Sequence, residues 1–457
     1  MLQPARRQIA ALLGAVLLVA GCAPATPSGS SPASVQPSPS VAPSVGVGEV
    51  VPAPGSSSTV YEPNPGAIVV AIDPGHGGCL DWGVPDPGKR GPEFSEKTMT
   101  LAIGLELKRV LEEQGITVVM TRDTDAAIAG DDYPALGCTG PPFRDVNGDG
   151  QAGFDPEGKT RTRDELQSRL DLVNLARADL LVSIHINSLT QNGVVFEIAA
   201  TQTYYTDETP WGVNATQHLA QQIQDGVVDA MDPIASYERQ DRGISAVNLY
   251  IVAPPLFVTT PERPDPVMQP TRGALMPAIL TEVGSITLAA EQDLLLSPEG
   301  QSAAAAGIAS GLISYFADRP LAVRYDALIP GGDAGLVPMP AGGSGPPFFA
   351  AAIRRAELAQ GIRVRLTNTG SGPWPSDLRL LAGWQQGSVP YLREPPAEMS
   401  PLEVAVPALA PGESVVLDVP IEVPSGEGGL LWISLADADQ AFSDLGSAPL
   451  QLGTSGP

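Results

Sequence analysis

The chain contains few of the residues that carry chemistry at neutral pH. Its 457 residues include only three histidines and three cysteines, and aromatic residues make up 5% of the composition. Basic residues are also scarce, since 26 Lys and Arg stand against 51 Asp and Glu, a formal net charge of -25. A field of this sign repels phosphate polymers, so the composition argues against a nucleic-acid ligand or an anionic membrane surface.

The N-terminal apolar run is too short to span a bilayer comfortably. It covers residues 9–20, about a dozen, and two arginines precede it, which is the pattern of an export signal. The run ends in Val-Ala-Gly-Cys at 19–22, which resembles the lipobox of bacterial lipoproteins. That resemblance implies a signal peptide at 1–21 and a lipid anchor on Cys22, at the outer face of the cell membrane. An ordinary signal peptide is the alternative.

Composition divides the rest of the chain into four parts. Residues 22–66 are rich in Pro, Ser and Ala and predict a disordered tether. Residues 67–318 alternate β-branched runs with helical patterns, which predicts an α/β domain with a mostly parallel twisted sheet and helices on both faces. Residues 319–349 are Pro- and Gly-rich and predict a linker. Residues 350–457 carry short strand-like runs split by turns, which predicts an all-β sandwich that weakly resembles immunoglobulin-like (Ig-like) domains.

Local patterns place the elements of the α/β domain. Strands are predicted at 68–72, 116–121, 180–186, 194–198 and 278–283, with a strand-like run at 248–252. Helices are predicted from an N-cap at Ser95 to about 114, from a Thr162–Glu165 capping box to about 178, from Asn214 to about 231, and from Ser297-Pro298 to about 316. In the sandwich, strands are predicted at 362–367, 378–381, 402–406, 414–421 and 429–435.

Three polar residues stand at the ends of predicted strands: His76, His185 and Glu282. In an open α/β sheet, ligands gather beyond the carboxyl ends of the strands, and Glu96 opens the helix that follows the His76 loop. Two imidazoles and a carboxylate are the ligand set of a catalytic zinc, which lowers the pKa of a bound water to about 7. A further carboxylate can pass the water's proton to a leaving amine. Spacing alone leaves a metal site and a coincidence equally open.

At this point the motifs resemble a known family, the zinc-dependent N-acetylmuramoyl-L-alanine amidases (amidase type 3) of cell-division and sporulation autolysins. The resemblance is carried by DPGHGG at 73–78, Glu-Lys at 96–97, TRD at 121–123, the run from Arg169 to SIHINS at 183–188, and LTEVG at 280–284. It implies a phosphorylase/hydrolase-like sheet and a hydrolase that cleaves the amide between N-acetylmuramic acid and L-alanine in peptidoglycan by a zinc-activated water. Such an enzyme serves cell-wall remodelling or daughter-cell separation.

The resemblance also assigns roles. It implies His76, Glu96 and His185 as zinc ligands and Glu282 as the catalytic acid/base. Glu93 is a rival ligand by position, but the Glu-Lys pair at 96–97 fits the family pattern better.

Two further polar residues are less defined. Asn187 either positions substrate or supports a ligand, or it only closes a turn. His218, inside the predicted helix after Asn214, is interpreted as a surface or packing group.

The segment 124–161 departs from the family pattern. Asp145, Asn147 and Asp149, followed by a glycine, match the opening of a calcium loop, but Pro156 stands where the closing Glu is expected. A calcium site and a solvated acidic loop therefore both remain open.

The same segment is predicted to lie beside the zinc site, where it covers the site as a lid or guides the substrate. A disulfide between Cys79 and Cys138 is predicted to link it to the His76 loop. Two free thiols are the alternative. A second insertion, 252–276, is predicted to border the same site. Neither insertion has the pattern of an autoinhibitory helix, so the sequence identifies no regulatory activator.

Two other functions compete with the amidase. A zinc peptidase or a carbohydrate deacetylase would use the same ligand chemistry on another wall substrate. A non-catalytic wall-binding protein would keep the fold, but it is expected to have lost a ligand or the base, and all four residues are present. The C-terminal sandwich is interpreted as a binding or spacing module.

Overall fold

A computed structural model describes residues 68–130, 145–146, 163–191, 194–209, 212–253, 273–328, 353–354, 361–386, 396, 398–424 and 429–455. Two sets of strands form separate cores within them, and each is described in turn. Within these residues, no helix is both long and apolar enough to cross a bilayer.

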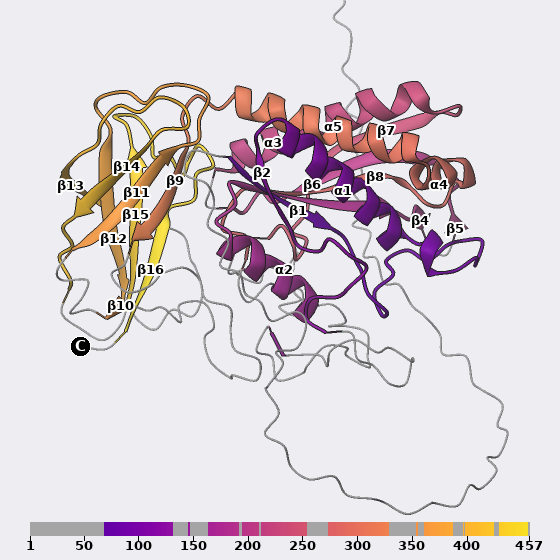
Figure 1. The fold of residues 1–457 in the computed structure, drawn as a ribbon, viewed down its shortest axis with the longest axis horizontal. Coiled ribbons are helices and arrows are strands. Elements are labelled where there is room, and N and C mark those ends of the chain that lie inside the picture. Colours follow the sequence, from indigo (N-terminus) through magenta and orange to yellow (C-terminus); the bar gives the residue numbers. More distant parts are fainter. Residues whose placement is uncertain are drawn as a thin grey trace, which may run out of the picture. The chain divides into compact units, whose positions relative to one another are not determined.

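The larger sheet has six strands in the order β2-β1-β3-β8-β6-β7 (Figure 1). Their bounds are β1 (Val69–Pro74), β2 (Thr117–Met120), β3 (Leu180–Asn187), β6 (Ala199–Tyr205), β7 (Arg239–Ala246) and β8 (Ala278–Ser285). All neighbouring strands are parallel except β6 and β8, which are antiparallel. The predicted mostly parallel sheet is therefore confirmed.

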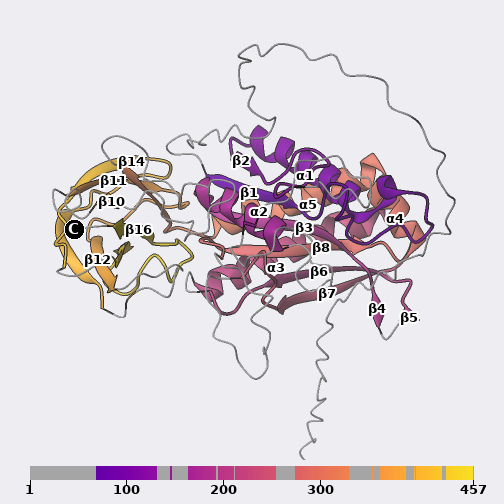
Figure 2. The ribbon, with the colours of Figure 1, turned by 90° about the horizontal axis from the view of Figure 1, so that it is seen from below.

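Helices cover both faces of this sheet (Figures 1 and 2). They are α1 (Glu96–Glu113), α2 (Arg163–Leu175), α3 (Val213–Met231), α4 (Ala289–Leu296) and α5 (Pro298–Ala317). Val70 and Ile72 of β1 lie in one core with α1, α3 and α5, whereas Val69 and Ala71 lie in a second core with α2. Because successive strand residues point to opposite faces, burial on both faces explains the unbroken apolar run that begins the domain.

Shorter elements complete the α/β part of the chain. They are the 3-10 turns η1 (Pro92–Phe94) and η3 (Asp232–Ile234) and a small hairpin of β4 (Thr190–Gln191) and β5 (Val194–Val195). Only Val194–Val195 of the strand predicted at 194–198 is extended, and the strand of the main sheet is β6. The prediction was wrong because Thr201 and Thr203 are buried polar residues that break the apolar pattern. Their hydroxyls are satisfied by Val283 O, at 3.0 Å, and Gln224 Oε1, at 2.9 Å.

The strand-like run at 248–252 is not a strand either. Tyr250, Ile251 and Val252 are buried in the core beside α2, so packing against a helix and not pairing in a sheet explains their apolar character. The edge strand is instead β7, whose sequence RQDRGISA has almost no apolar residue.

One predicted helix cap is confirmed and one is not. Ser297 precedes α5, and its hydroxyl accepts a hydrogen bond from Gly300 N at 3.1 Å. Ser95 precedes α1 as predicted, but its hydroxyl donates to Pro92 O and caps no N–H of the helix.

Of two other predicted helix starts, one lies partly outside the described residues and one differs from the prediction. Thr162 of the predicted capping box is not described, and the carboxylate of Glu165 accepts from the backbone N–H groups of Ile128 and Ala129, each at 2.7 Å, and pairs with Arg169. Helix α3 begins at Val213 after Gly212, so Asn214 lies inside the first turn and is not the N-cap.

The C-terminal part is all-β, as predicted. One sheet has the order β10-β16-β15-β12-β13 and the other β14-β11-β9. Their bounds are β9 (Val323–Leu328), β10 (Ile353–Arg354), β11 (Ile362–Asn368), β12 (Arg379–Gln386), β13 (Ser400–Ala405), β14 (Ser414–Val419), β15 (Gly429–Ala436) and β16 (Leu450–Ser455). Val364 of β11 and Leu431 of β15 lie in one core, which also contains the edge-to-face pair Trp374 and Phe442.

Strand β9 corrects the predicted linker at 319–349. Residues 323–328 pair along their whole length with β11, so the all-β part begins earlier than residue 350. The densest Pro and Gly run, at 330–347, follows β9 and not α5, which is why composition placed the boundary too late. The other domain boundaries and the Ig-like assignment stay predictions.

Candidate functional site

The loop that carries His76 follows β1 directly. His76 has φ 64, a left-handed conformation that is uncommon for a residue other than glycine. Two hydrogen bonds hold the loop in this conformation: Arg169 Nη2 donates to His76 O at 2.6 Å, and Gly77 N donates to Asp81 O at 2.8 Å. The imidazole is thereby fixed at the carboxyl edge of the sheet.

Two buried arginines hold this loop through hydrogen bonds to its backbone. Arg169 donates to Asp73 Oδ1 and to Pro74 O, each at 2.8 Å, and Arg122 donates to Pro74 O at 2.8 Å and to Gly75 O at 3.0 Å. Burial alone would raise the pKa of Asp73, but the charge of Arg169 and hydrogen bonds, first among them that of Ser183, lower it below its ordinary value. A fully partnered network of this kind is rigid.

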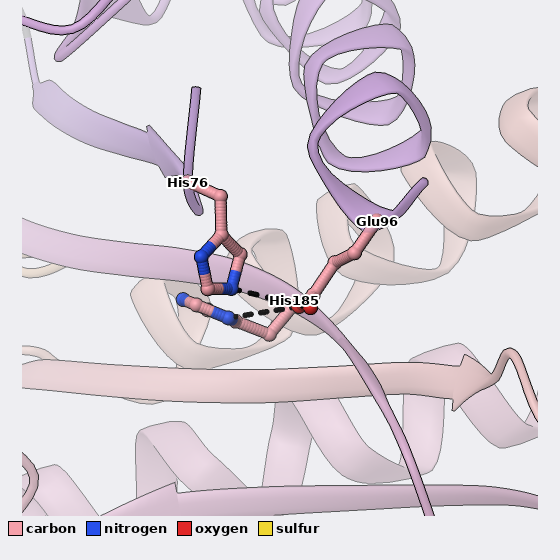
Figure 3. A group of neighbouring side chains, drawn as sticks. All are labelled: His76, Glu96 and His185. Atoms are coloured by element: carbon pink, nitrogen blue, oxygen red, sulfur yellow. Dashed lines mark hydrogen bonds and ion pairs between the residues drawn. The ribbon is translucent and has the colours of Figure 1, made fainter. Parts of the chain in front are cut away.

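Glu96 contacts both imidazoles, which lie edge to face with their ring centroids 4.7 Å apart. It occupies the first turn of α1, and its Oε2 is 3.2 Å from His76 Nε2 while its Oε1 is 3.0 Å from His185 Nδ1 (Figure 3). One ligand atom from each residue lies within 4.8 Å of the others, so the three side chains could hold a metal ion. The rival Glu93 is exposed in η1, and the structure does not bring it into this group.

Two glycines make room for these side chains. A Cβ atom at position 75 would overlap the ring of His185, and one at position 83 would overlap Glu96 Oε2 and the ring of His76. Gly83 also has φ 66, which favours glycine. The close approach of the side chains of His76, Glu96 and His185 therefore requires glycine at both positions.

Asp81 is a functional residue that sequence reasoning missed. Its Oδ1 accepts a hydrogen bond from His76 Nδ1 at 2.8 Å, which leaves Nε2 as the ring nitrogen that faces Glu96. A carboxylate that fixes the tautomer of a histidine in this way is a regular companion of metal-binding histidines. The available signal was its place in the loop, five positions after His76.

The charges in this group favour a cation. Burial lowers the pKa of His76, but the charges of Asp81 and Glu96 outweigh it, and the pKa lies well above the ordinary value of 6.5. Burial raises the pKa of Glu96, yet the charge of His76 and the hydrogen bonds from both imidazoles hold it well below 4.5. Two neutral imidazole nitrogens and one carboxylate oxygen, in a place that favours positive charge, fit a zinc ion.

Glu282 lies at the same edge of the sheet, beside His185. It pairs in register with His185 across β3 and β8, its residue is 8% exposed, and its Oε2 has no hydrogen-bond partner among the described residues. Burial raises its pKa well above 4.5, and the nearby charge of Glu96 raises it further, against a smaller opposing effect of His76. The result is a buried carboxyl group with an unengaged oxygen beside the His–Glu–His group.

Asn187 ends β3 two residues after His185. Its side chain acts on the hydroxyl of Tyr204 on β6, whose pKa burial raises and Asn187 lowers, and the sequence did not indicate Tyr204. His218 lies on α3, with Nε2 3.3 Å from Asp318 Oδ2 and its ring 5.8 Å from that of Tyr315, in a mixed surface and packing environment.

The remaining predicted sites are covered only in part. Cys79 is disulfide-bonded, but Cys138 and Cys22 lie outside the described residues, so the predicted pairing and the lipid anchor stay predictions. Asp145 is described and is partly buried, whereas Asn147 and Asp149 are not described. The calcium loop therefore also stays a prediction.

Fold and site together define a class: an α/β protein with a candidate metal centre of the kind that metal-dependent hydrolases use, and a free buried carboxyl group beside it. Residues 70–314, more than half of the chain, match the model of the N-acetylmuramoyl-L-alanine amidase family. The chain belongs to this family.

Individual proteins are also similar to this chain. The germination-specific N-acetylmuramoyl-L-alanine amidase of Bacillus subtilis is 25% identical over 252 residues, which cover 55% of this chain and 81% of that protein. The sporulation-specific N-acetylmuramoyl-L-alanine amidase of the same organism is 26% identical over 251 residues, 54% of this chain and 68% of that protein. The crystal structure of an N-acetylmuramoyl-L-alanine amidase from Clostridium difficile 630 is 26% identical, covers 55% of this chain and 97% of that chain, and gives a TM-score of 0.36.

The predicted enzyme class is thereby confirmed. This protein is an amidase that hydrolyses the amide bond between N-acetylmuramic acid and L-alanine in peptidoglycan.

Proposed function

We propose that His76, Glu96 and His185 hold a catalytic zinc ion for this hydrolysis. The observation that carries the proposal is the convergence of their donor atoms within 4.8 Å, beside the unengaged Oε2 of Glu282. A zinc ion held by these three residues would supply Lewis acidity for the attack of water on the scissile carbonyl.

Glu282 acts as the proton shuttle. As a base, it takes the proton of the attacking water on its unengaged oxygen while the new C–O bond forms at the lactyl carbonyl. As an acid, it then gives that proton to the nitrogen of L-alanine as the C–N bond breaks. Burial raises its pKa above the ordinary value, so this carboxyl group holds a proton more tightly than an exposed glutamate does before it gives the proton to the leaving nitrogen. The products are a lactyl carboxylate and a free L-alanine amine.

The neighbouring residues keep this geometry. Asp81 orients the His76 ring, and the guanidinium of Arg169 holds the His76 backbone by donating to His76 O. Ile186 N and Val84 N each donate to Glu96, at 2.9 and 2.8 Å.

We further propose that the enzyme works outside the cell membrane, held there by a lipid on Cys22 at the end of a long tether. Its substrate lies outside that membrane, and the N-terminal apolar run with its terminal cysteine supports export. The all-β part would act as an Ig-like spacing or binding module, and a Cys79–Cys138 disulfide would hold the segment 124–161 near the site.

Digestion of purified peptidoglycan tests the proposal. The protein is assayed as prepared, after removal of metal by a chelator, and after return of zinc, and the products are identified by mass. We expect new lactyl carboxyl and L-alanine amino ends, loss of product after chelation, and recovery with zinc. Cleavage between amino acids, or release of acetate, would instead identify a peptidase or a deacetylase. Full activity in protein shown to be free of zinc would refute the mechanism.

A further inference from the structure

A row of polar side chains leads from Glu282 across β6 to β7. Gln202 of β6 pairs directly with Glu282 of β8, so the two side chains lie on the same face of the sheet. Tyr204 Oη donates to Gln202 Oε1, and Gln202 Nε2 donates to Ser245 Oγ on β7, each at 3.0 Å. These hydrogen bonds fix the row and extend the site by two strands.

A bulge in β7 adds a charged residue to this row. Thr201 of β6 pairs with Asp241, but Thr203 pairs with Ile244, so β7 contains one extra residue at this point. Asp241 accepts from Gln224 of α3 at 2.6 Å and Ile244 packs in the core beside α3, so both point to that face. In a bulge two residues oppose one residue of the partner strand, so Arg242 and Gly243 lie opposite Gln202, and Arg242 is placed on the face that carries Gln202 and Ser245.

Arg242 is exposed, and within the described residues no carboxylate forms an ion pair with it. Its neighbour Arg239 is in contrast buried and paired with Glu291 and Asp232. The guanidinium of Arg242 is therefore available to an anionic ligand.

Against the effect of burial, the positive charge of Arg242 lowers the pKa of Tyr204, one of the side chains in this row. Burial raises the pKa of Tyr204 to about 12, and the charge of Glu282 adds to this, while Arg242 and the hydrogen bond from Asn187 oppose it. Ser245 is also available, because its oxygen accepts from Gln202 and its hydroxyl proton remains free to donate.

We propose that Arg242, with the hydroxyl of Ser245, binds a free carboxylate of the stem peptide, on the L-alanine side of the scissile amide. The inference rests on the proposed function, which places that amide beside Glu282. A guanidinium fork and a hydroxyl are strong donors to a carboxylate. Strand β7 lies two strand spacings from β8, roughly 10 Å, and an extended peptide advances about 3.3 to 3.6 Å per residue. The bound carboxylate therefore belongs to the second or third residue beyond the bond.

The test compares two N-acetylmuramoyl peptides that differ in one group. In one the residues after L-alanine carry a free carboxylate, and in the other that group is a carboxamide. The measured quantity is the ratio of the two kcat/KM values. We expect the wild-type chain to prefer the carboxylate, and Arg242→Gln to lower this ratio by about tenfold to a hundredfold, the range for a charge-assisted hydrogen bond. Arg242→Lys is expected to keep part of the preference, since it keeps the charge but not the fork.

The matched control is Arg363→Gln, which removes an exposed arginine from β11 and is expected to keep the wild-type ratio. An equal loss on both substrates in Arg242→Gln, or an unaltered ratio, overturns the inference and leaves the amidase function standing. If the wild-type chain releases L-alanine amine from neither substrate, the proposed function fails, and the inference fails with it.

Discussion

The two sides of the site hold their buried carboxylates in different ways. On the side of α1, both oxygens of Glu96 are engaged, by the two imidazoles and by the backbone N–H groups of Ile186 and Val84. On the side of β8, Oε2 of Glu282 has no partner among the described residues. The pKa of Glu96 lies below its ordinary value and that of Glu282 lies above it, although burial raises both.

The difference separates a binding role from a reacting role. A fully hydrogen-bonded carboxylate keeps its charge and its position, as a metal ligand must. A buried oxygen without a partner costs about 1 to 3 kcal/mol of stability, and such a group is retained where function requires it. The structure therefore distinguishes the two glutamates by their surroundings. A variant of Glu96 is expected to lose zinc, and a variant of Glu282 is expected to lose activity but keep zinc.

The largest effect is expected for Glu96→Gln. Replacing a charged ligand oxygen by an amide removes the negative charge that faces both imidazoles. We expect the purified variant to contain little zinc and to lose activity by more than about 10⁴-fold, beyond the loss for an acid/base group alone. Glu93→Gln is the matched control: it makes the same change at an exposed position three residues earlier, and both zinc and activity should remain. Zinc retained by Glu96→Gln at the wild-type level would contradict the ligand assignment.

Glu282→Gln should fail differently. The amide has nearly the same shape but cannot take a proton from water, so kcat is expected to fall by about 10² to 10⁴-fold. Zinc content, measured on the same samples by elemental analysis, should stay at the wild-type level. A variant that lost zinc in parallel with activity would make Glu282 a ligand and not a base, and the contrast with Glu96 would disappear.

Asp81→Asn is expected to have a smaller effect, on the metal alone. An asparagine can still touch His76 but gives up the charge that favours the Nδ1–H tautomer, so zinc affinity should fall by about 10 to 100-fold. Competition with a chelator of known affinity measures this loss. Activity should return in excess zinc, which a misfolded variant would not show. Asp123→Asn, which removes a charge from an exposed position, should bind zinc as the wild-type chain does.

The sequence predicted the parts of this site that lie near strand ends. His76 and His185 follow or end apolar runs that are buried on both faces, so their meeting at one edge follows from parallel topology alone. Glu96 was placed by the helix that opens after the loop. The role of Glu282 came from the family resemblance, because a carboxylate at a strand end does not by itself show whether its oxygens are engaged.

Other parts could not be predicted, because they depend on register. Ser245 lies opposite Tyr204 only because β7 has one extra residue opposite β6, and a single sequence does not show a bulge between two polar strands. Strand β6 was missed because its buried threonines bond to groups distant in sequence, Gln224 and Val283. Asp81 lies near His76 in the chain, but its hydrogen bond depends on the fold of a glycine-rich turn.

The smallest expected effect is on the free energy of unfolding. Its dependence on pH has opposite signs for Glu282 and Glu96. Because the pKa of Glu282 is raised in the folded chain, the folded state binds this proton more tightly than the unfolded state does, and stability falls as pH rises from about 4.5 through the raised pKa. For Glu96, whose pKa is lowered, stability is present above about 4.5 and is lost as pH falls. Chelator-treated Glu282→Gln should therefore be more stable than the wild-type chain at neutral pH, by on the order of 1 kcal/mol, and this advantage should shrink toward pH 4.5. Urea unfolding at a series of pH values measures the difference. An advantage that did not vary with pH would mean that Glu282 is not the titrating group, and the contrast between the two carboxylates would then rest on hydrogen bonding alone.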